Sequence, residues 1–335
     1  MSRPVLPSTV AADPAPDADI SCGLWLGLLG VAIFALSLPM TRVAVGTTAD
    51  PQMSGVFVAM GRAGVAGLLS VVFLAATRAP WPQRRQWFGL VMVAVGVVFG
   101  FPLLTSIAMR YVEGVHASVI VGVLPLATAA VGALLHRQRP SAGFWWCAAA
   151  GSALVVAFAV LRSGGVSSGP VSPHLADLLL MAAMLLGALG YGYGARLSTG
   201  MRGDHVICWA LVLSLPVTLP LSVVSLPARA VPWSAWLAFG YVAVFSMWLG
   251  FFAWYRGLAL GGTVRVSQVQ LVQPFLSMLV AVPLLGERLD LVAVGFGLAV
   301  IATVFIGKKM PVGVARPALA PSAAASAAAL KPGAP

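Results

Sequence analysis

Apolar residues dominate this chain in runs of about 20 residues, and the short stretches between the runs hold most of the charged side chains. A run of this length is sufficient for a helix to cross the hydrocarbon core of a bilayer. We therefore expect an all-α integral membrane protein, with helix ends placed to within about 2–4 residues. The pattern predicts ten membrane-spanning helices, at residues 21–41, 54–76, 87–107, 115–135, 142–161, 175–195, 205–227, 234–255, 263–285 and 290–307.

The longest connection between the predicted helices divides them into two sets of five. It reads RSGGVSSGPVSPH, and its Ser, Gly and Pro content is typical of a linker. Both ends of the chain are rich in Pro and Ala, and we expect them to be tails without packed structure. The expected organisation is a disordered tail at 1–20, a first five-helix unit at 21–161, the linker at 162–174, a second five-helix unit at 175–308 and a low-complexity tail at 309–335.

The two sets of helices also repeat in sequence. A shift of 149 residues aligns four pairs of residues without a gap: Ser118 with Ser267, Pro125 with Pro274, Thr128 with Ser277, and Arg139 with Arg288. Because each set has an odd number of helices, the second copy would lie upside down in the membrane relative to the first. Inverted repeats of this kind are the plan of many transporters, whose substrate site lies near the bilayer midplane between the copies.

Composition agrees with a membrane protein. The chain is 60% hydrophobic and only 9% charged, with a mean hydropathy of +0.96, whereas about 25% of the residues of a soluble domain are charged. The net charge of +11 would suit a nucleic-acid partner, but the basic residues stand singly or in pairs between apolar runs. The lipid bilayer is therefore the expected partner, together with a small-molecule substrate, and no nucleic acid is expected. The sequence leaves the oligomeric state open.

The distribution of basic residues predicts the orientation. With a cytoplasmic N-terminus, 14 Lys and Arg residues fall on the cytoplasmic side and 5 on the opposite side. Cytoplasmic loops carry an excess of these residues, so we expect a multi-pass protein of the cell (inner) membrane with both termini cytoplasmic. The three cysteines have no metal or redox spacing, and neither a cofactor nor a metal is expected.

A stripe of polar residues follows the ninth predicted helix. At about 100° per residue, its members fall within roughly one third of the helix circumference. They are Ser267, Gln270, Gln273, Pro274 and Ser277. Unpaired amides in hydrocarbon are costly, so this face does not point to lipid. Two interpretations remain: the stripe lines a wet cavity that binds substrate, or it makes hydrogen bonds between helices.

Prolines and polar residues recur at matching depths in other helices. Ser118, Pro125 and Thr128 of the fourth helix take the same angular face as the stripe on the ninth. Paired Pro125 and Pro274 each remove a backbone hydrogen bond and bend their helices, either to let each half rock or as static kinks. In the first helix, Pro39 interrupts the segment between Ser37 and Thr41, whose hydroxyls are expected at the cavity mouth.

Arg62 is the one basic residue that falls well inside a predicted span. A charge at that depth is costly and usually faces the interior of the bundle. The arginine either attracts an anionic group of a substrate, such as a carboxylate, or is a structural tie to backbone carbonyls or to a neighbouring helix. In the eighth helix, Trp248 lies deep enough to stack on a ring or to cover an apolar substrate.

Other aromatic residues stand near the predicted helix ends. Tyr191 and Tyr193 lie in the segment GALGYGYGARL, whose glycines favour close helix approach, and Trp254 and Tyr255 end the eighth helix. The two tyrosines point to different faces, so at most one of them lines a cavity. We expect these four residues to belong to the aromatic belt at the membrane interface.

Acids and histidines are missing from the middle of every predicted span. A buried proton relay normally uses such residues, so we expect facilitated diffusion or exchange, or proton coupling at the cavity mouth through Glu113 or His116. The same lack argues against an enzyme, because catalysis in the bundle needs a positioned nucleophile and base or metal ligands. A polytopic receptor or assembly protein is a further alternative, although it does not require an internal repeat.

Two motifs resemble the EamA-type members of the drug/metabolite transporter superfamily. They are the helix proline followed by small and apolar residues and then GER, near residue 287, and the segment FVAMGRAGVAGLLS at 57–70. The resemblance covers about residues 21–307. It implies an exporter of small metabolites, amino acids or amphiphilic compounds, working by alternating access through a central cavity. The first half departs from the motif, since Gln138 stands where the second half has Glu287.

Overall fold

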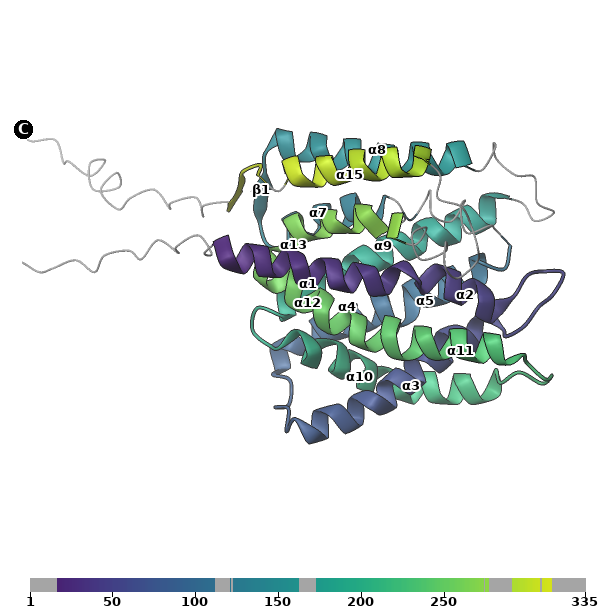
Figure 1. Ribbon diagram of the computed structural model, residues 1–335. Coiled ribbons are helices and arrows are strands. Elements are labelled where there is room, and N and C mark those ends of the chain that lie inside the picture. Colours follow the sequence, from purple (N-terminus) through teal and green to yellow (C-terminus); the bar gives the residue numbers. More distant parts are fainter. Residues whose placement is uncertain are drawn as a thin grey trace, which may run out of the picture.

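The computed structural model describes residues 17–111, 121, 123–162, 173–273, 275–276, 291–307 and 309–314. Helices make up nearly all of this part, and most of them run along one common direction as a bundle (Figure 1). The elements fall into two groups along the chain, one before and one after the connection at 163–172.

Before this connection, the first predicted span is split in two and the third is built from four successive pieces. The elements are α1 (Asp17–Ala35), α2 (Ser37–Val45), α3 (Gly55–Ala76), the 3₁₀-helix η1 (Arg84–Gln86), α4 (Trp87–Val93), the π-helix η2 (Ala94–Gly100), α5 (Phe101–Ala108), α7 (Leu124–Leu135), the strand β1 (Gln138–Pro140) and α8 (Ala142–Arg162).

After the connection, a second π-helix and a second 3₁₀-helix interrupt the α-helices. The elements are α9 (Pro173–Leu197), α10 (Gly203–Val224), α11 (Trp233–Tyr241), the π-helix η3 (Val242–Leu249), α12 (Gly250–Gly261), α13 (Thr263–Val266), the 3₁₀-helix η4 (Ser267–Val272), α15 (Leu291–Gly307) and the strand β2 (Val312–Val314).

Six helical segments of the described residues are long and apolar enough to cross a bilayer. They are Asp19–Val45, Gly55–Ala76, Arg84–Ala108, Leu175–Leu197, Gly203–Val224 and Trp233–Gly261. Three shorter apolar helices, Leu124–Leu135, Ala142–Phe158 and Gly295–Gly307, fall in other predicted spans. The predicted spans 115–135 and 263–285 lie partly outside the described residues, so the count of ten stays a prediction.

The described residues extend a little into both expected tails. Helix α1 begins at Asp17, within the expected tail 1–20, and β2 lies within the expected tail 309–335. The described residues are mostly helical, and β1 and β2 add a short antiparallel pair with Arg139 opposite Gly313. Strands of three residues are too short to show an alternating hydrophobic pattern, and their pairing satisfies backbone groups beyond the helix ends.

Two pairs of neighbouring helices run antiparallel. Along α3 and α10, Phe73 contacts His205 near one end, while Gly64 faces Leu219 and Ser222 towards the other. Along α8 and α15, Phe158 stacks on Phe296 at one end, and at the other Cys147 approaches Gly307.

Two further helix pairs approach so closely that only glycine fits between them. Gly23 of α1 lies against the backbone of Gly257 and Gly261 in α12. Gly96 of η2 lies against the backbone of Leu186 and Gly190 in α9. The expectation that glycines of the sixth span allow close approach is thus confirmed at Gly190, and close contact of backbones is a common way of packing membrane helices.

The basic loops gather at one end of the bundle. Gly89 contacts Leu197, Gly203 contacts the backbone of Arg256, and the ring of His136 lies 3.3 Å from the Thr263 hydroxyl. The paired strands β1 and β2 lie at this same end, beside the start of α1 (Figure 1). Lysine or arginine lies in or beside each of these connections.

Two aromatic residues expected at the membrane interface are buried instead. Trp254 and Tyr255 are both fully inaccessible, and the Tyr255 hydroxyl donates to the Gly190 carbonyl at 3.2 Å. The prediction of a belt position for them was wrong. The glycines of α1 and α9 let both helices come close to α12, so the residues at its middle become core.

Candidate functional site

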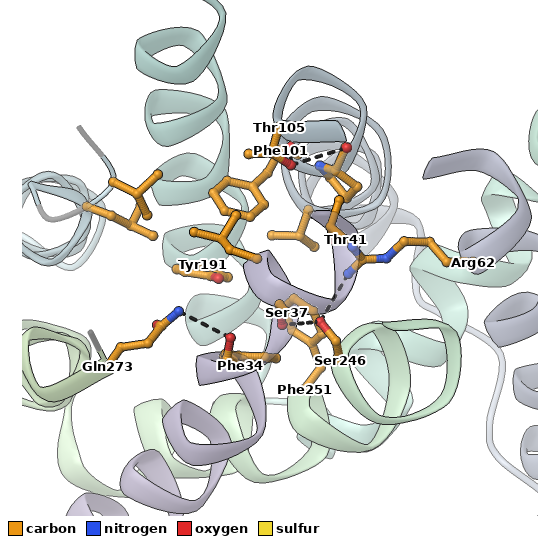
Figure 2. A pocket seen from close by; sticks show the side chains of 15 residues that line it. Phe34, Ser37, Thr41, Arg62, Phe101, Thr105, Tyr191, Ser246, Phe251 and Gln273 are labelled. Atoms are coloured by element: carbon orange, nitrogen blue, oxygen red, sulfur yellow. Dashed lines mark hydrogen bonds between the residues drawn. The ribbon is translucent and has the colours of Figure 1, made fainter. Parts of the chain in front are cut away.

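A small cavity lies inside the bundle, where helices from before and after the connection at 163–172 meet (Figure 2). Its volume is about 40 Å³, slightly more than the roughly 30 Å³ that one water molecule occupies in the liquid. Sites for organic ligands usually measure roughly 300–1,000 Å³. The space between the described lining residues is therefore much smaller than a typical site for an organic ligand. Its lining consists of Phe34, Ser37, Leu38, Thr41, Arg62, Val97, Phe101, Pro102, Thr105, Val121, Leu124, Tyr191, Ser246, Phe251 and Gln273.

A polar cluster of Ser37, Arg62 and Ser246 forms one wall of this cavity (Figure 2). The hydroxyl oxygens of Ser37 and Ser246 are 2.6 Å apart, and Arg62 donates from one terminal nitrogen to Ser246 Oγ at 3.1 Å. The cluster joins α2, α3 and the π-helix η3. The consecutive helices α2 and α3 are thus joined to η3, which is distant in sequence, by neutral hydroxyls and one guanidinium.

Irregular helix geometry places both serines of the cluster. Ser37 is the first residue of α2, directly after the break at Leu36 and two residues before Pro39, which cannot donate a backbone hydrogen bond. Ser246 lies in the π-helix η3, where the wider turn shifts side chains relative to an α-helix. Broken helices in membrane proteins are tolerated where they line a cavity.

Arg62 is 5% exposed, and its Nε atom has no hydrogen-bond partner among the described residues. Within that same part of the chain, the recorded ion pair joins Arg202 and Asp204 at the start of α10 and does not involve Arg62. Among the described residues, the guanidinium is therefore buried beside a hydroxyl group rather than beside a carboxylate. The hydrogen bond to Ser246 is a contact with a neighbouring helix of the kind expected from the structural interpretation, and binding of an anionic group stays a prediction.

The opposite wall carries an aromatic ring and amides. Tyr191 of α9 is buried and lines the cavity, as does Gln273, which donates to the Phe34 carbonyl at 3.3 Å (Figure 2). Gln270 is 4% exposed, and neither polar atom of its amide has a hydrogen-bond partner among the described residues. Tyr191 and Gln270 are close enough to interact. The belt position expected for Tyr191 was therefore wrong.

The polar residues of the stripe on the ninth predicted span lie more nearly above one another than they would on an α-helix. Residues Ser267–Val272 form a 3₁₀-helix, in which side chains three apart stand above one another. Ser267, Gln270 and Gln273 therefore share one face. Gln273 reaches the cavity, Gln270 is buried beside it, and the Ser267 hydroxyl bonds to the Val264 carbonyl of its own helix at 3.0 Å. Gln268 instead points towards the Pro125 carbonyl at 3.5 Å.

Several other predicted residues lie outside this lining. Thr128 is fully buried in α7, and its hydroxyl has no partner among the described residues. Trp248 packs on Phe73 and Phe252, away from the cavity lining. Pro125 is in the first turn of α7. The remaining candidates, Glu113, His116, Ser118, Pro274 and Ser277, lie outside the described residues.

The sequence did not single out the phenylalanines of the cavity wall. Phe34, Phe101 and Phe251 all line the cavity, but none differs in sequence context from the apolar residues around it. Ser246 stood out only as a polar residue in an apolar run, and the π-helix that turns it inward has no sequence signature. Ser37 and Thr41, expected at the mouth, are both in the lining.

Comparisons with known proteins agree on one family. The sequence profile of the EamA-like transporter family matches residues 21–161 and 174–307. A Bacillus subtilis (strain 168) protein named "Uncharacterized transporter YdeK" is 44% identical over 290 residues, covering 85% of this chain and 96% of the relative. A second protein of that strain, "Uncharacterized transporter YyaM", is 23% identical over 274 residues, covering 77% of this chain and 85% of the relative.

The fold also matches a solved structure described as "Crystal structure of protein". The TM-score is 0.69 with 16% sequence identity, covering 86% of this chain and 98% of the other. At this identity the likeness shows a shared fold and nothing more.

Proposed function

Because the chain belongs to the EamA-like transporter family, we propose that it exports small organic solutes across the cell (inner) membrane by alternating access through the cavity described above. Family membership and the names of the two Bacillus relatives support a membrane transporter rather than an enzyme. Those relatives are named without a substrate. The outward direction is part of the proposal and follows the resemblance to drug/metabolite transporters.

The observation that carries this proposal is the position and chemistry of the cavity. It is buried in an apolar bundle, yet it is lined by an arginine, two serines, two threonines, a tyrosine and a glutamine. Polar residues at such depth are costly and usually mark a solute pathway. The lining comes from helices on both sides of the connection at 163–172, as expected for a site between two halves.

Helix packing supports an inverted repeat. Helices α3 and α10 both have 22 residues, and their first residues are 148 positions apart. Helices α8 and α15 form a second pair of this kind. Each helix packs antiparallel against its own counterpart, which is the arrangement that a twofold axis in the membrane plane produces.

The two π-helices support the same symmetry. Helix η2 begins at Ala94 and η3 begins at Val242, again 148 positions apart. A π-helix within an α-helix weakens the regular hydrogen-bond ladder and often occurs at functional sites. We infer that these two segments are the places where each half bends as the cavity opens to one side or the other.

The gathering of basic loops at one end supports the proposed orientation. At the other end, Arg42 and Arg110 donate to the backbone carbonyls of Met109 and Met53. An excess of Lys and Arg marks the cytoplasmic face. We therefore place the start of α1 and the paired strands β1 and β2 in the cytoplasm.

The direct test of transport is counterflow in proteoliposomes, with a panel of radiolabelled amino acids and other small metabolites. We expect at least one to accumulate when the vesicles hold an excess of the same unlabelled solute. Protein-free liposomes are the control for leakage. If no solute of a broad panel exchanges through correctly inserted protein, the proposed function is wrong.

Replacing Gln270 with leucine separates a role in transport from a role in stability. Its amide is buried without a partner among the described residues, and such a group costs about 1–3 kcal/mol. The leucine variant should therefore be at least as heat-stable as the unchanged protein. If the amide binds solute in the open cavity, flux falls by about tenfold, the value of one hydrogen bond.

Thermal unfolding and counterflow should be measured on the same preparation of the Gln270→Leu variant. Gln52→Ala, in the loop at the Arg42 end of the bundle, is the control for loss of an unrelated glutamine. A stable Gln270→Leu variant with normal flux of every transported solute would remove Gln270 from the solute pathway.

A further inference from the structure

Among the described lining residues, charge comes from a single source. Arg62 is the only one of them that carries a formal charge, since the other fourteen are neutral. Four acids whose side chains are described are not in that lining and lie in a loop or towards helix ends: Asp19, Asp50, Asp177 and Asp204. The described lining is thus electropositive, in a bundle where little water screens the charge.

The hydrogen bonds of Arg62 leave part of its guanidinium available. One terminal nitrogen donates to a neutral hydroxyl, that of Ser246, and Nε has no partner among the described residues. A buried cation that lacks a counter-charge is strongly disfavoured, and a carboxylate would offset that cost through two parallel charge-assisted hydrogen bonds.

The counterpart helix of the second half has no arginine at the position equivalent to Arg62. In the second half, the positions 148 and 149 residues further on are Ala210 and Leu211, both buried and apolar. At these two positions, the face of α10 that corresponds to the Arg62 face of α3 carries no charged residue. A role limited to holding helices together would not explain why only one of two equivalent helices carries a cation.

We propose that Arg62, with Ser37 and Ser246, is the subsite that binds a carboxylate of the transported solute. This inference rests on the proposed transport function and names its substrate class. The solute carries a carboxylate at one end and an uncharged body at the other. Solutes with a net positive charge are excluded, because no described acid in the lining offsets the guanidinium.

The rest of the lining fits the uncharged body. Phe34, Phe101, Tyr191 and Phe251 supply aromatic surface, and Gln273 supplies an amide. Aromatic and apolar walls with few polar groups are typical of sites for small organic ligands. The side chains of Phe101 and Phe251 come from helices that directly follow η2 and η3, so bending at these π-helices would widen the space between them.

The test uses three probes that share a benzyl group and differ in charge: phenylacetate, phenylacetamide and phenethylamine. Their binding to the full-length protein in nanodiscs is measured by isothermal titration calorimetry at neutral pH. We expect phenylacetate to bind, phenylacetamide to bind about 10-fold to 100-fold more weakly, as expected for a charge-assisted pair, and phenethylamine not to bind.

Variants at Arg62 identify the group responsible. Arg62→Gln should reduce the affinity for phenylacetate to that for phenylacetamide. Arg62→Lys keeps the positive charge but lacks the two parallel donors of a guanidinium, so it should retain part of the affinity for phenylacetate. Arg110→Gln is the control, because Arg110 is also partly buried but bonds to a backbone carbonyl outside the cavity. The three-probe comparison on the unchanged protein stands even if the Arg62 variants do not insert.

Failure of this inference can be told apart from failure of the proposed function. Equal binding of the three probes, preference for the amine, or no binding of phenylacetate would overturn the carboxylate subsite. If counterflow still finds neutral or cationic solutes transported, the transport function stands without it. If no solute exchanges at all, the proposed function itself is wrong.

Discussion

Transport should stop when cysteines placed at positions 37 and 246 are oxidised to a disulfide, and it should return when the disulfide is reduced. The hydroxyl oxygens of Ser37 and Ser246 are 2.6 Å apart, so two sulfur atoms at these positions lie within reach of a bond of about 2.05 Å after a small adjustment. The bond would fasten α2 to η3 in the closed arrangement. A transporter locked in one conformation completes no cycle, and we expect flux to fall about tenfold or more.

The experiment measures counterflow of a transported solute before oxidation, after oxidation and after reduction. It begins from a protein whose natural cysteines, Cys22, Cys147 and Cys208, are replaced by serine. The Ser37→Cys and Ser246→Cys single variants show whether loss of either hydroxyl impairs flux on its own. Full flux through quantitatively cross-linked protein would mean that α2 and η3 do not separate during transport.

A second large effect is expected from Gly96→Leu, which should strongly destabilise the folded protein. A β-carbon at this position would meet the carbonyl oxygen of Leu186 at 2.4 Å and the α-carbon of Gly190 at 2.7 Å. Both are backbone atoms of α9, which cannot move aside as a flexible side chain would. Overpacking usually costs about 1–3 kcal/mol even among side chains. A loss of about 2 kcal/mol in the free energy of unfolding lowers the folded-to-unfolded ratio by roughly 30-fold.

The yield and melting temperature of detergent-purified Gly96→Leu protein check this expectation. Gly240→Leu is the matched control, because a β-carbon on Gly240 of α11 has no neighbour within 4 Å. We expect the control to match the unchanged protein. A Gly96→Leu protein that melts at the normal temperature would show that η2 and α9 are further apart in solution than in the structure.

Hydropathy alone predicts where the helices lie. Membrane helices need a long apolar run, so Gly55–Ala76 and Gly203–Val224 could be placed within about three residues of their ends from composition. The breaks inside the helices could not be predicted in this way. A proline signals the break before Pro39, but the π-helices η2 and η3 have apolar sequences that suit an α-helix equally well.

The candidate site could be predicted in part. Polar residues in apolar runs stand out, which is why Arg62, Gln273, Ser37 and Thr41 could be named in advance. The phenylalanines of the lining could not be named in advance, because the sequence does not show which neighbours a phenylalanine will have. Tyr191 illustrates the limit: its place near a helix end suggested the interface, whereas the close approach of α9 to η2 turns it into the cavity wall.

Access to the cavity from both faces of the membrane is the most direct test of the mechanism. A cysteine is introduced at Thr41, which lines the cavity and is 2% exposed, in protein without its natural cysteines. A membrane-impermeant thiol reagent is then applied to right-side-out and to inside-out vesicles. Alternating access predicts labelling from both faces, slowed in each case by a transported solute. Labelling from one face only, in protein that still exchanges solute, would contradict it.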